Sequence, residues 1–198
     1  YQLVPTLADG QRRRNIETDT TQKLLMNVFR AGNAHLPGVY FDEENRRHLL
    51  NIRSIYADQA AAMAEKGNKV EAVNVLQKAE SLMNPKAFPY AMTSSIQNQN
   101  NHNRVGLLYL EAAYKAGHTD LAAKVKAALV KDLNDQVKHY QYLKGYNEDY
   151  YYQLASEEQD AQQFLEIIKQ FEQMYEGKQP QVQELPSGAN AADTSTRQ

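Results

Sequence analysis

The sequence contains no cysteine, and this absence excludes several classes of chemistry. A chain without thiols forms no disulfide, no cysteine-ligated zinc site and no thiol nucleophile. Long apolar runs are missing as well, since no stretch approaches the about 18 consecutive apolar residues that a transmembrane helix requires. We therefore expect no direct membrane insertion by this chain.

A large net charge of either sign is also lacking. The formal charge is -2 over 198 residues, from 24 acidic and 22 basic side chains. Because proteins that bind nucleic acid usually present a strongly basic surface, we do not expect nucleic acid as a partner. The basic run at residues 12–14 is short and lies in a polar segment, where we expect it to be solvated.

Recognisable catalytic and metal-binding motifs are scarce. None of the five histidines stands four residues from another, and the sequence has neither a glycine-rich phosphate loop nor a Gly-x-Ser-x-Gly elbow. His102 lies in the run NNHNR, which is similar to a nuclease motif, but that motif needs a ββα metal fold that the surrounding helical pattern disfavours. We predict no catalytic residue, no metal site and no cofactor.

What the sequence does contain is helical periodicity. Apolar residues recur at spacings of three and four, and alternation with period two is confined to the first few residues. This pattern predicts an all-α fold of about six helices, arranged as stacked antiparallel helical hairpins in one domain over residues 1–176. The predicted segments are an extended N-terminal stretch and loop at 1–17, a first helix at 18–31, a hairpin at 42–84, an insert at 85–104, a second hairpin at 105–144 and a last helix at 147–176. Residues 177–198 have almost no apolar mass, which predicts a flexible tail.

The hairpin at 42–84 carries the clearest repeat signal. The roughly 34-residue tetratricopeptide pattern sets the size of side chains around a helix–turn–helix unit. Its positions here hold Tyr56, Ala60, Met63, Gly67, Ala72, Leu76 and Ala79. The alanines should let the two helices approach closely while the bulky residues fill the space beside them. The second hairpin repeats only the turn glycine and one alanine, and a generic helical bundle is the alternative interpretation.

A polar segment is the first candidate binding surface. It runs from Tyr40 to Arg53 and includes Asn45 and Arg47, after Asp42, which is expected to cap a helix. Arginines in an otherwise apolar hairpin either form ion pairs within the architecture or hold an anionic group of a partner. Both interpretations remain open at this point.

A concentration of tyrosines between residues 140 and 152 is the second candidate surface. Tyr142, Tyr146 and Tyr150 share one face if this segment is a continuous helix. Open rings could grip a sugar or a peptide, because tyrosine offers a flat apolar face and a hydroxyl group. The alternative is that the rings pack a helix junction with their hydroxyls at its rim.

Three runs in the first quarter of the chain resemble a known family. They are YQLVP at residues 1–5, MNVFRAG at 26–32 and VYFDEENRR at 39–47, with Arg53 beyond. They look like the C-terminal region of bacterial multi-spanning membrane proteins similar to protein O-mannosyltransferases, which carry a GT-C-type glycosyltransferase membrane portion. The resemblance, clearest over residues 1–90, implies a soluble tetratricopeptide-like appendage on the extracytoplasmic (periplasmic) side of the inner membrane. It implies that any glycosyl transfer belongs to the membrane portion and that no catalytic residue of the family lies in this chain.

Three functional hypotheses follow from these observations. The first is a non-catalytic helical-repeat domain that binds or scaffolds a protein or peptide, or docks on its own membrane domain. The second is a carbohydrate-binding module that uses the tyrosines at 140–152 as a platform for a glycan. The third is a hydrolase that works with a pair of carboxylates facing each other across a cleft.

Overall fold

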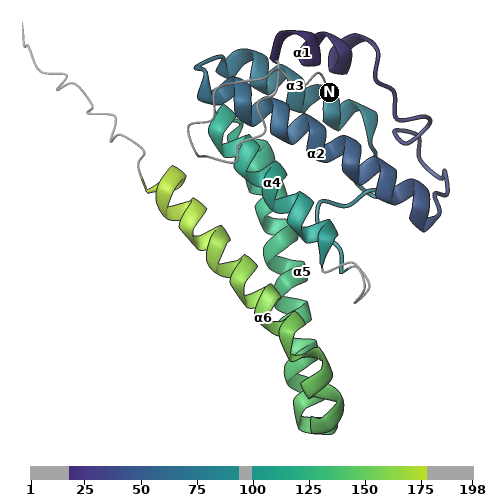
Figure 1. Cartoon of the computed structure of the whole chain (residues 1–198), viewed down its shortest axis with the longest axis vertical. Coiled ribbons are helices and arrows are strands. Elements are labelled where there is room, and N and C mark those ends of the chain that lie inside the picture. The colour runs from purple at the N-terminus through teal and green to yellow at the C-terminus, as the bar shows by residue number, and fades with distance from the viewer. Residues whose placement is uncertain (1–17, 94–99, 178–198) are drawn as a thin grey trace, which may run out of the picture.

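A computed structural model describes residues 18–93 and 100–177, and it is all-helical over these ranges (Figure 1). The helices are α1 (Thr18–Asn27), α2 (Glu43–Glu65), α3 (Lys69–Leu82), α4 (Asn101–Ala116), α5 (Thr119–Tyr146) and α6 (Glu148–Phe171), followed by the short π-helix η2 (Glu172–Glu176). The described residues contain no β-strand, so the predicted all-α fold of about six helices is confirmed. The predicted extended segment at 1–17, and the predicted tail from residue 178 onward, lie outside the described residues.

Consecutive helices pack against one another as antiparallel pairs. The α2–α3 pair is covered by α4, which lies across both helices, while α5 packs on α4 and then pairs with α6 along most of its length. Figure 1 shows the far end of the α5–α6 pair projecting away from the body that α1 to α4 form. The fold therefore has a packed body and a long helical arm.

The α2–α3 hairpin buries the residues that the sequence pattern assigns to its core. Each of these side chains is at most 3% exposed: Tyr56, Ala60, Met63, Ala72, Leu76 and Ala79. The turn between the helices passes through Gly67, whose φ of 87° is a left-handed conformation that glycine adopts at little cost. The packing predicted for this hairpin is confirmed, whereas its assignment to the tetratricopeptide family stays a prediction.

The first helix is shorter than predicted. It ends at Asn27, and not at residue 31, because the chain turns there to bury Ala31 and Ala34 against Met83 and Phe88 in a second small core. A backbone hydrogen bond of 2.8 Å from the amide of Asn84 to the carbonyl of Ala34 holds this turn in place. Burial of Ala31 and Ala34 in the folded protein stabilises this turn more than a longer α1 would. The spacing of apolar residues in the sequence does not reveal this difference.

Helix boundaries in the second half of the chain also differ from the predicted ones. The helix α4 begins at Asn101, inside the predicted insert, and α5 continues to Tyr146. Asn147 then adopts an extended conformation, and its side chain accepts a hydrogen bond of 3.0 Å from the backbone N–H of Tyr150. One asparagine therefore ends α5 and caps α6, so the tyrosine-rich segment is not one continuous helix.

Close packing around α4 depends on a glycine inside the helix. A Cβ atom added at Gly106 would lie 2.5 Å from the backbone carbonyl oxygen of Tyr90 and 2.9 Å from a side-chain carbon of Leu129. The absence of a side chain therefore lets α4 approach both α5 and the segment that follows α3. That segment and the start of α4 form part of the site described next.

Candidate functional site

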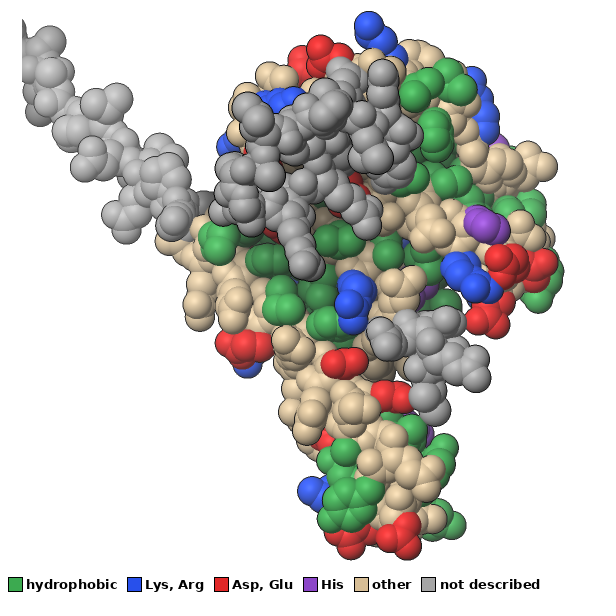
Figure 2. Space-filling model, viewed as in Figure 1, with side chains coloured by type: hydrophobic (Ala, Val, Ile, Leu, Met, Phe, Trp, Pro, Cys, Tyr) green, Lys and Arg blue, Asp and Glu red, His purple; other side chains and the backbone are tan. Residues whose placement is uncertain are grey.

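A pocket of about 370 Å³ lies where α2 and α4 begin. Its wall combines residues before and within the first turns of α2 with two residues of the α3–α4 connection and with the start of α4. The lining residues are Tyr40, Phe41, Glu43, Arg46, Arg47, Leu50, Met92, Thr93, Asn101 and His102. Figure 2 shows acidic and basic side chains gathered on the side of the molecule where α2 begins. The pocket has a size ordinary for a ligand site and a mixed apolar and polar wall.

The first turn of α2 is built around the predicted cap. Asp42 accepts hydrogen bonds from the backbone N–H of Asn45 at 2.8 Å and from the side-chain amide of Asn45 at 2.9 Å. Asp42 therefore caps α2 as predicted, and Asn45 serves this cap and does not line the pocket. The cap fixes the direction of α2 and, with it, the positions of the arginines in its next turn.

Two consecutive arginines reach the pocket from α2, in different electrostatic settings. Arg47 is more than half exposed and forms an ion pair with Glu44, which also contacts His48. The Nε atom of Arg46 is buried, and among the described residues it has no hydrogen-bond partner. Arg46 therefore lines the pocket with a side chain whose Nε atom is enclosed by the protein.

His102 forms part of the opposite wall and is only 3% exposed. Its Nε2 atom lies 2.7 Å from the carbonyl oxygen of Pro89. Because a carbonyl oxygen only accepts hydrogen bonds, Nε2 must carry the proton, and Nδ1 of the neutral ring then holds a lone pair. This Nδ1 is buried without a hydrogen-bond partner in the described part of the chain. Burial is the main reason that the pKa of His102 is lowered, so the ring favours its neutral form.

The helix α4 points its N-terminus at the same pocket. Its N-cap, Asn100, has a left-handed φ of 53° and makes no side-chain capping hydrogen bond. The first turn of α4 contains no acidic residue, unlike the first turn of α2. In the described part of the chain, neither a capping side chain of Asn100 nor an acidic residue of the first turn therefore offsets the positive end of the α4 dipole.

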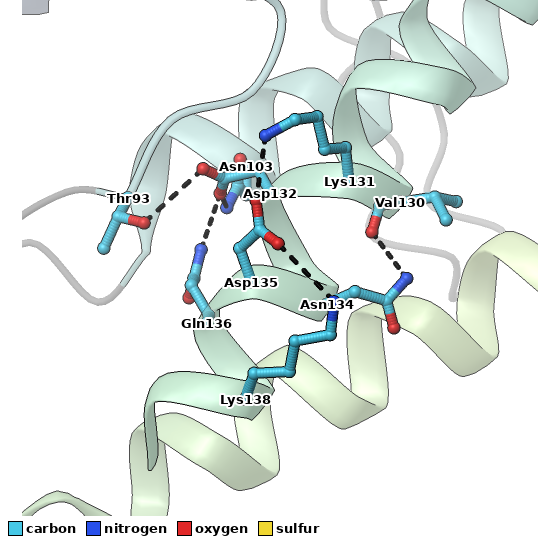
Figure 3. A network of polar contacts seen from close by, with 9 residues as sticks. All are labelled: Thr93, Asn103, Val130, Lys131, Asp132, Asn134, Asp135, Gln136 and Lys138. Carbon is cyan, nitrogen blue, oxygen red and sulfur yellow. Dashed lines mark hydrogen bonds and ion pairs between the residues drawn. The ribbon is translucent and has the colours of Figure 1, made fainter. Parts of the chain in front are cut away.

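A polar network fixes the residues on both sides of the start of α4 (Figure 3). The side chain of Asn103 is fully buried, accepts a hydrogen bond of 3.0 Å from the backbone N–H of Met92 and donates one of 2.7 Å to Asp132. Asp132 also accepts from Gln136 at 2.7 Å and from Thr93 at 3.5 Å. The network joins α4 and α5 to the segment at 92–93 and so holds one wall of the pocket.

Replacement of Asn103 by leucine, which has a similar size, is expected to lower the free energy of unfolding by about 2 kcal/mol, because the backbone N–H of Met92 loses its acceptor inside the protein. Urea denaturation followed by circular dichroism measures this change. Asn134 on α5 offers a matched control, since its amide is exposed and donates to the carbonyl of Val130 on the same helix. Asn134→Leu should change the stability by less than about 0.5 kcal/mol. Equal effects of the two changes would show that the network does not stabilise the fold.

Arg53, a predicted surface residue, lies inside the protein. Only 3% of it is exposed, and its guanidinium donates to the carbonyl oxygens of Phe88 at 2.7 Å and Pro89 at 2.8 Å. It also lies over the rings of Tyr90 and Tyr109, at 5.5 and 5.9 Å from their centres. Of the two interpretations left open for this arginine, the structure therefore supports the architectural one. Arg53 and the pocket residue His102 share the carbonyl oxygen of Pro89 as a hydrogen-bond partner, which links Arg53 to the pocket wall.

The predicted tyrosine surface is divided between two helices at the tip of the α5–α6 arm. Tyr142 and Tyr146 are 68% and 78% exposed, and their rings stack nearly parallel, with centroids 6.1 Å apart and an angle of 8°. Tyr150 is exposed too but comes from α6, beyond the break at Asn147. Figure 2 shows side chains of the hydrophobic class, which includes tyrosine, gathered at this tip, away from the start of α2.

Other tyrosines of this segment pack the junction between α5 and α6. Tyr140 is buried and donates a hydrogen bond of 2.7 Å to Glu157. Tyr151 donates one of 2.7 Å to Glu158. Some rings of this segment are therefore open to solvent and others pack at the helix junction, whereas binding of a sugar or peptide by the open rings stays a prediction.

A second pocket of about 320 Å³ lies between α4 and α6. Two carboxylates line it, Glu111 from α4 and Asp160 from α6, together with apolar residues such as Phe164 and Phe171. Glu111 forms an ion pair of 2.6 Å with Lys115, so this carboxylate already has a basic partner. The hydrolase hypothesis would need the two carboxylates, Glu111 and Asp160, to work as general acid and general base.

Sequence patterns pointed to the α2 side of the first pocket but not to its other side. The polar segment at 40–53 contains its α2 wall, and Arg47 was a named candidate. Arg46 and His102 were missed as site residues, since the signal that joins them is tertiary contact between segments far apart in the chain.

None of the described helices combines the length and the apolar character that a membrane span needs. Within the described ranges, no three histidine or carboxylate side chains come together to hold a metal ion.

Comparison with protein-family models, with curated proteins and with solved structures finds no match to this chain. Its function is therefore argued from the geometry of the site.

Proposed function

We propose that this chain is a non-catalytic helical binding domain whose ligand is a protein or peptide. In this proposal the ligand inserts a side chain or a chain end into the pocket at the start of α2 and α4. The observation that carries the proposal is the composition of the pocket wall, where Tyr40 and Phe41 lie beside Arg46 and Arg47. Tyrosine and arginine are among the residue types that contribute most to binding at protein interfaces.

The construction of the site supports this assignment. The walls come from two helices and from a segment that the buried network of Asn103 and Asp132 ties down. Such a site is largely preformed, so little entropy is lost in ordering it when a ligand binds. Tyr40 is highly exposed at the pocket and is available to cover an inserted ligand.

Selection of displayed random peptides on the 198-residue chain tests this function. A double variant, Tyr40→Ser with Arg47→Ser, removes two exposed side chains of the pocket and should leave the fold intact. Selected peptides are expected to bind this variant about tenfold or more weakly than the unaltered chain. The matched control is Tyr142→Ser with Tyr146→Ser at the other surface, which should bind as the unaltered chain does. Failure to select any peptide, or equal binding by the pocket variant, would overturn the proposal.

A second candidate function is the binding of a glycan at the tip of the α5–α6 arm. The parallel, exposed rings of Tyr142 and Tyr146 favour it, because a pair of open aromatic faces can pack against the apolar face of a sugar. A glycan array read with the unaltered chain and with the double tyrosine variant checks this candidate. Glycan binding that survives loss of both rings would remove the tip as the binding site.

The cellular setting is a separate proposal that rests on the runs at residues 1–5, 26–32 and 39–47. On this resemblance, the domain belongs to a membrane protein similar to protein O-mannosyltransferases and lies on the extracytoplasmic side of the inner membrane. Its own membrane domain is then a further partner to test. A fusion of the complete parent protein to a reporter active only outside the cytoplasm should show activity, and activity of a cytoplasm-specific reporter would contradict this placement.

A further inference from the structure

We propose that the second pocket, between α4 and α6, is a docking site for the N-terminal segment of the same chain, which inserts the side chains of Leu3 and Leu7 there. This pocket shares no lining residue with the pocket at the start of α2 and α4. The inference therefore goes beyond the proposed function and does not depend on it.

The wall of the second pocket presents apolar side chains to solvent. Leu107 and Phe164 are each 7% exposed, whereas Leu108 is 39% exposed and Ile167 is partly buried. Figure 2 shows hydrophobic side chains on the face of the molecule where α4 meets α6. Covering such a surface removes apolar area from water, which favours an apolar occupant.

The described chain begins beside the C-terminal end of α2. The carbonyl oxygen of Thr18 accepts a hydrogen bond of 2.8 Å from Gln59, and its hydroxyl oxygen accepts one of 2.9 Å from Lys66. Lys66 directly follows the last residue of α2. Residues 1–17 therefore join the body of the protein at this end of α2.

Two ion pairs connect this end of α2 to the second pocket. Lys115 of α4 pairs with Glu65, the last residue of α2, at 2.8 Å and with Glu111 at 2.6 Å. Glu111 in turn lines the second pocket. The stretch from Leu7 to Thr18 can span about 36 Å when it is extended, so Leu7 can reach the pocket.

The spacing of the two leucines fits the length of the second pocket. In an extended chain, Leu3 and Leu7 point to the same side and lie about 13 Å apart. Pro5 between them favours such a backbone. The pocket follows α4 from Arg104 to Glu111, which is about 10 Å of helix. Both leucine side chains can therefore enter the pocket together.

Charge favours the path from Thr18 to the second pocket. The basic run at residues 12–14 comes shortly before Thr18, so it would pass the C-terminal end of α2. The last turn of α2 contains no basic residue, and the ammonium of Lys66 beyond it donates to Thr18. A helix C-terminus carries the negative end of the dipole, which stabilises nearby cations.

The segment at 178–198 is the competing occupant, because Phe171 near the end of α6 also lines the second pocket. Its only large aliphatic side chains are Val182 and Leu185. These stand three positions apart, so in an extended chain they point to opposite sides. They could not both enter the pocket as Leu3 and Leu7 can.

Paramagnetic relaxation enhancement in the 198-residue chain tests the inference. The sequence has no cysteine, so Thr6→Cys provides a single site for a nitroxide label. Thr6 points away from the side that carries Leu3 and Leu7 in an extended chain, so the label should not block docking. Backbone amide signals at residues 104–111 and 163–171 are expected to lose intensity. A label at Asn190→Cys should leave the signals at 104–108 unchanged.

Variants of the segment connect the signal loss to the two leucines. Leu3→Ser with Leu7→Ser, made in the labelled Thr6→Cys chain, should restore most of the lost intensity. The matched control is Asp9→Ser with Gln11→Ser, which alters polar positions of the same segment and should leave the signal loss as it was.

Variants of the pocket wall test the other side of the contact. Leu108→Ser should also restore the lost intensity. Leu36→Ser is the control, because Leu36 has a similar exposure, 42%, but does not line the second pocket. Backbone amide spectra of each variant show whether its fold is intact.

Four results would overturn the inference. The first is no signal loss at residues 104–111 and 163–171 with the label at position 6. The second is signal loss that the Leu3 and Leu7 double variant does not reduce, and the third is loss at 104–108 caused by the label at position 190. The fourth is equal loss in a mixture of ¹⁵N-labelled chain without cysteine and unlabelled chain bearing the nitroxide, which would indicate docking between two copies.

Discussion

Replacement of Arg53 by methionine is expected to lower the free energy of unfolding by about 3–4 kcal/mol. Methionine has nearly the same length but no donor, so the carbonyl of Phe88 loses its 2.7 Å partner inside the protein. The guanidinium also interacts electrostatically with Glu80, which accepts hydrogen bonds from Tyr90 at 2.5 Å and Tyr109 at 2.9 Å. Its removal takes away this attraction from a partly buried carboxylate.

Thermal and urea denaturation of the Arg53 variant measure this loss, with Arg47→Met as the control on the same helix. Arg47 is exposed and its ion pair with Glu44 lies on the surface, so its removal should change the stability by less than about 1 kcal/mol. Arg53→Lys should fall between the two, because lysine keeps the charge but not the planar fork that reaches both carbonyls. A loss of less than about 1 kcal/mol for Arg53→Met would show that the buried guanidinium does not stabilise the fold.

Replacement of Gly106 by valine is expected to destabilise the domain by about 3 kcal/mol, the upper part of the usual range for overpacked cores. The added Cβ would lie 2.5 Å from the carbonyl oxygen of Tyr90. This oxygen belongs to the backbone, so it cannot move away by a simple side-chain rotation. Because α4 would have to move away from this segment, the wall of the pocket formed by Met92 and His102 would move with it. Binding of a selected peptide at the pocket should therefore weaken together with stability.

Gly145 provides the matched control for Gly106. It also lies in a helix, near the end of α5, and a Cβ added there meets no atom within 4 Å. Gly145→Ala should raise stability by about 0.5–1 kcal/mol, because alanine favours the helix and restricts the unfolded chain. Destabilisation by both changes would indicate that loss of glycine itself is harmful, and a neutral effect of Gly106→Val would contradict the close approach of α4.

Local sequence patterns predicted the elements whose causes are local. Asp42 caps α2 as predicted, because a cap needs only a short acceptor side chain a few residues before the N–H groups it serves. The turn at Gly67 and the buried alanines of the α2–α3 hairpin follow from the same short-range spacing. The end of α1 could not be predicted in this way, since burial of Ala31 and Ala34 against Phe88 decides it.

The candidate site was predictable only in part, because local spacing predicts local features and does not predict tertiary contacts. Arg47 could be selected because it lies in a dense polar segment, and Tyr142 with Tyr146 because they stand one helical turn apart. Arg46 and His102 come together only when α4 packs across α2, and the spacing of residues in the sequence does not predict that contact. His102 taken alone suggested a metal-dependent motif, and its unpartnered Nδ1 is visible only in the folded protein.

The location of the binding site is the central claim, and chemical-shift mapping tests it most directly. Backbone amide spectra of the ¹⁵N-labelled chain would be followed during titration with the strongest-binding of the selected peptides. Shifts are expected to concentrate at residues 40–50, 89–93 and 100–104, which form or adjoin the pocket. Shifts confined to the tyrosine-bearing tip at residues 140–152, or no saturable shifts at all, would contradict the account.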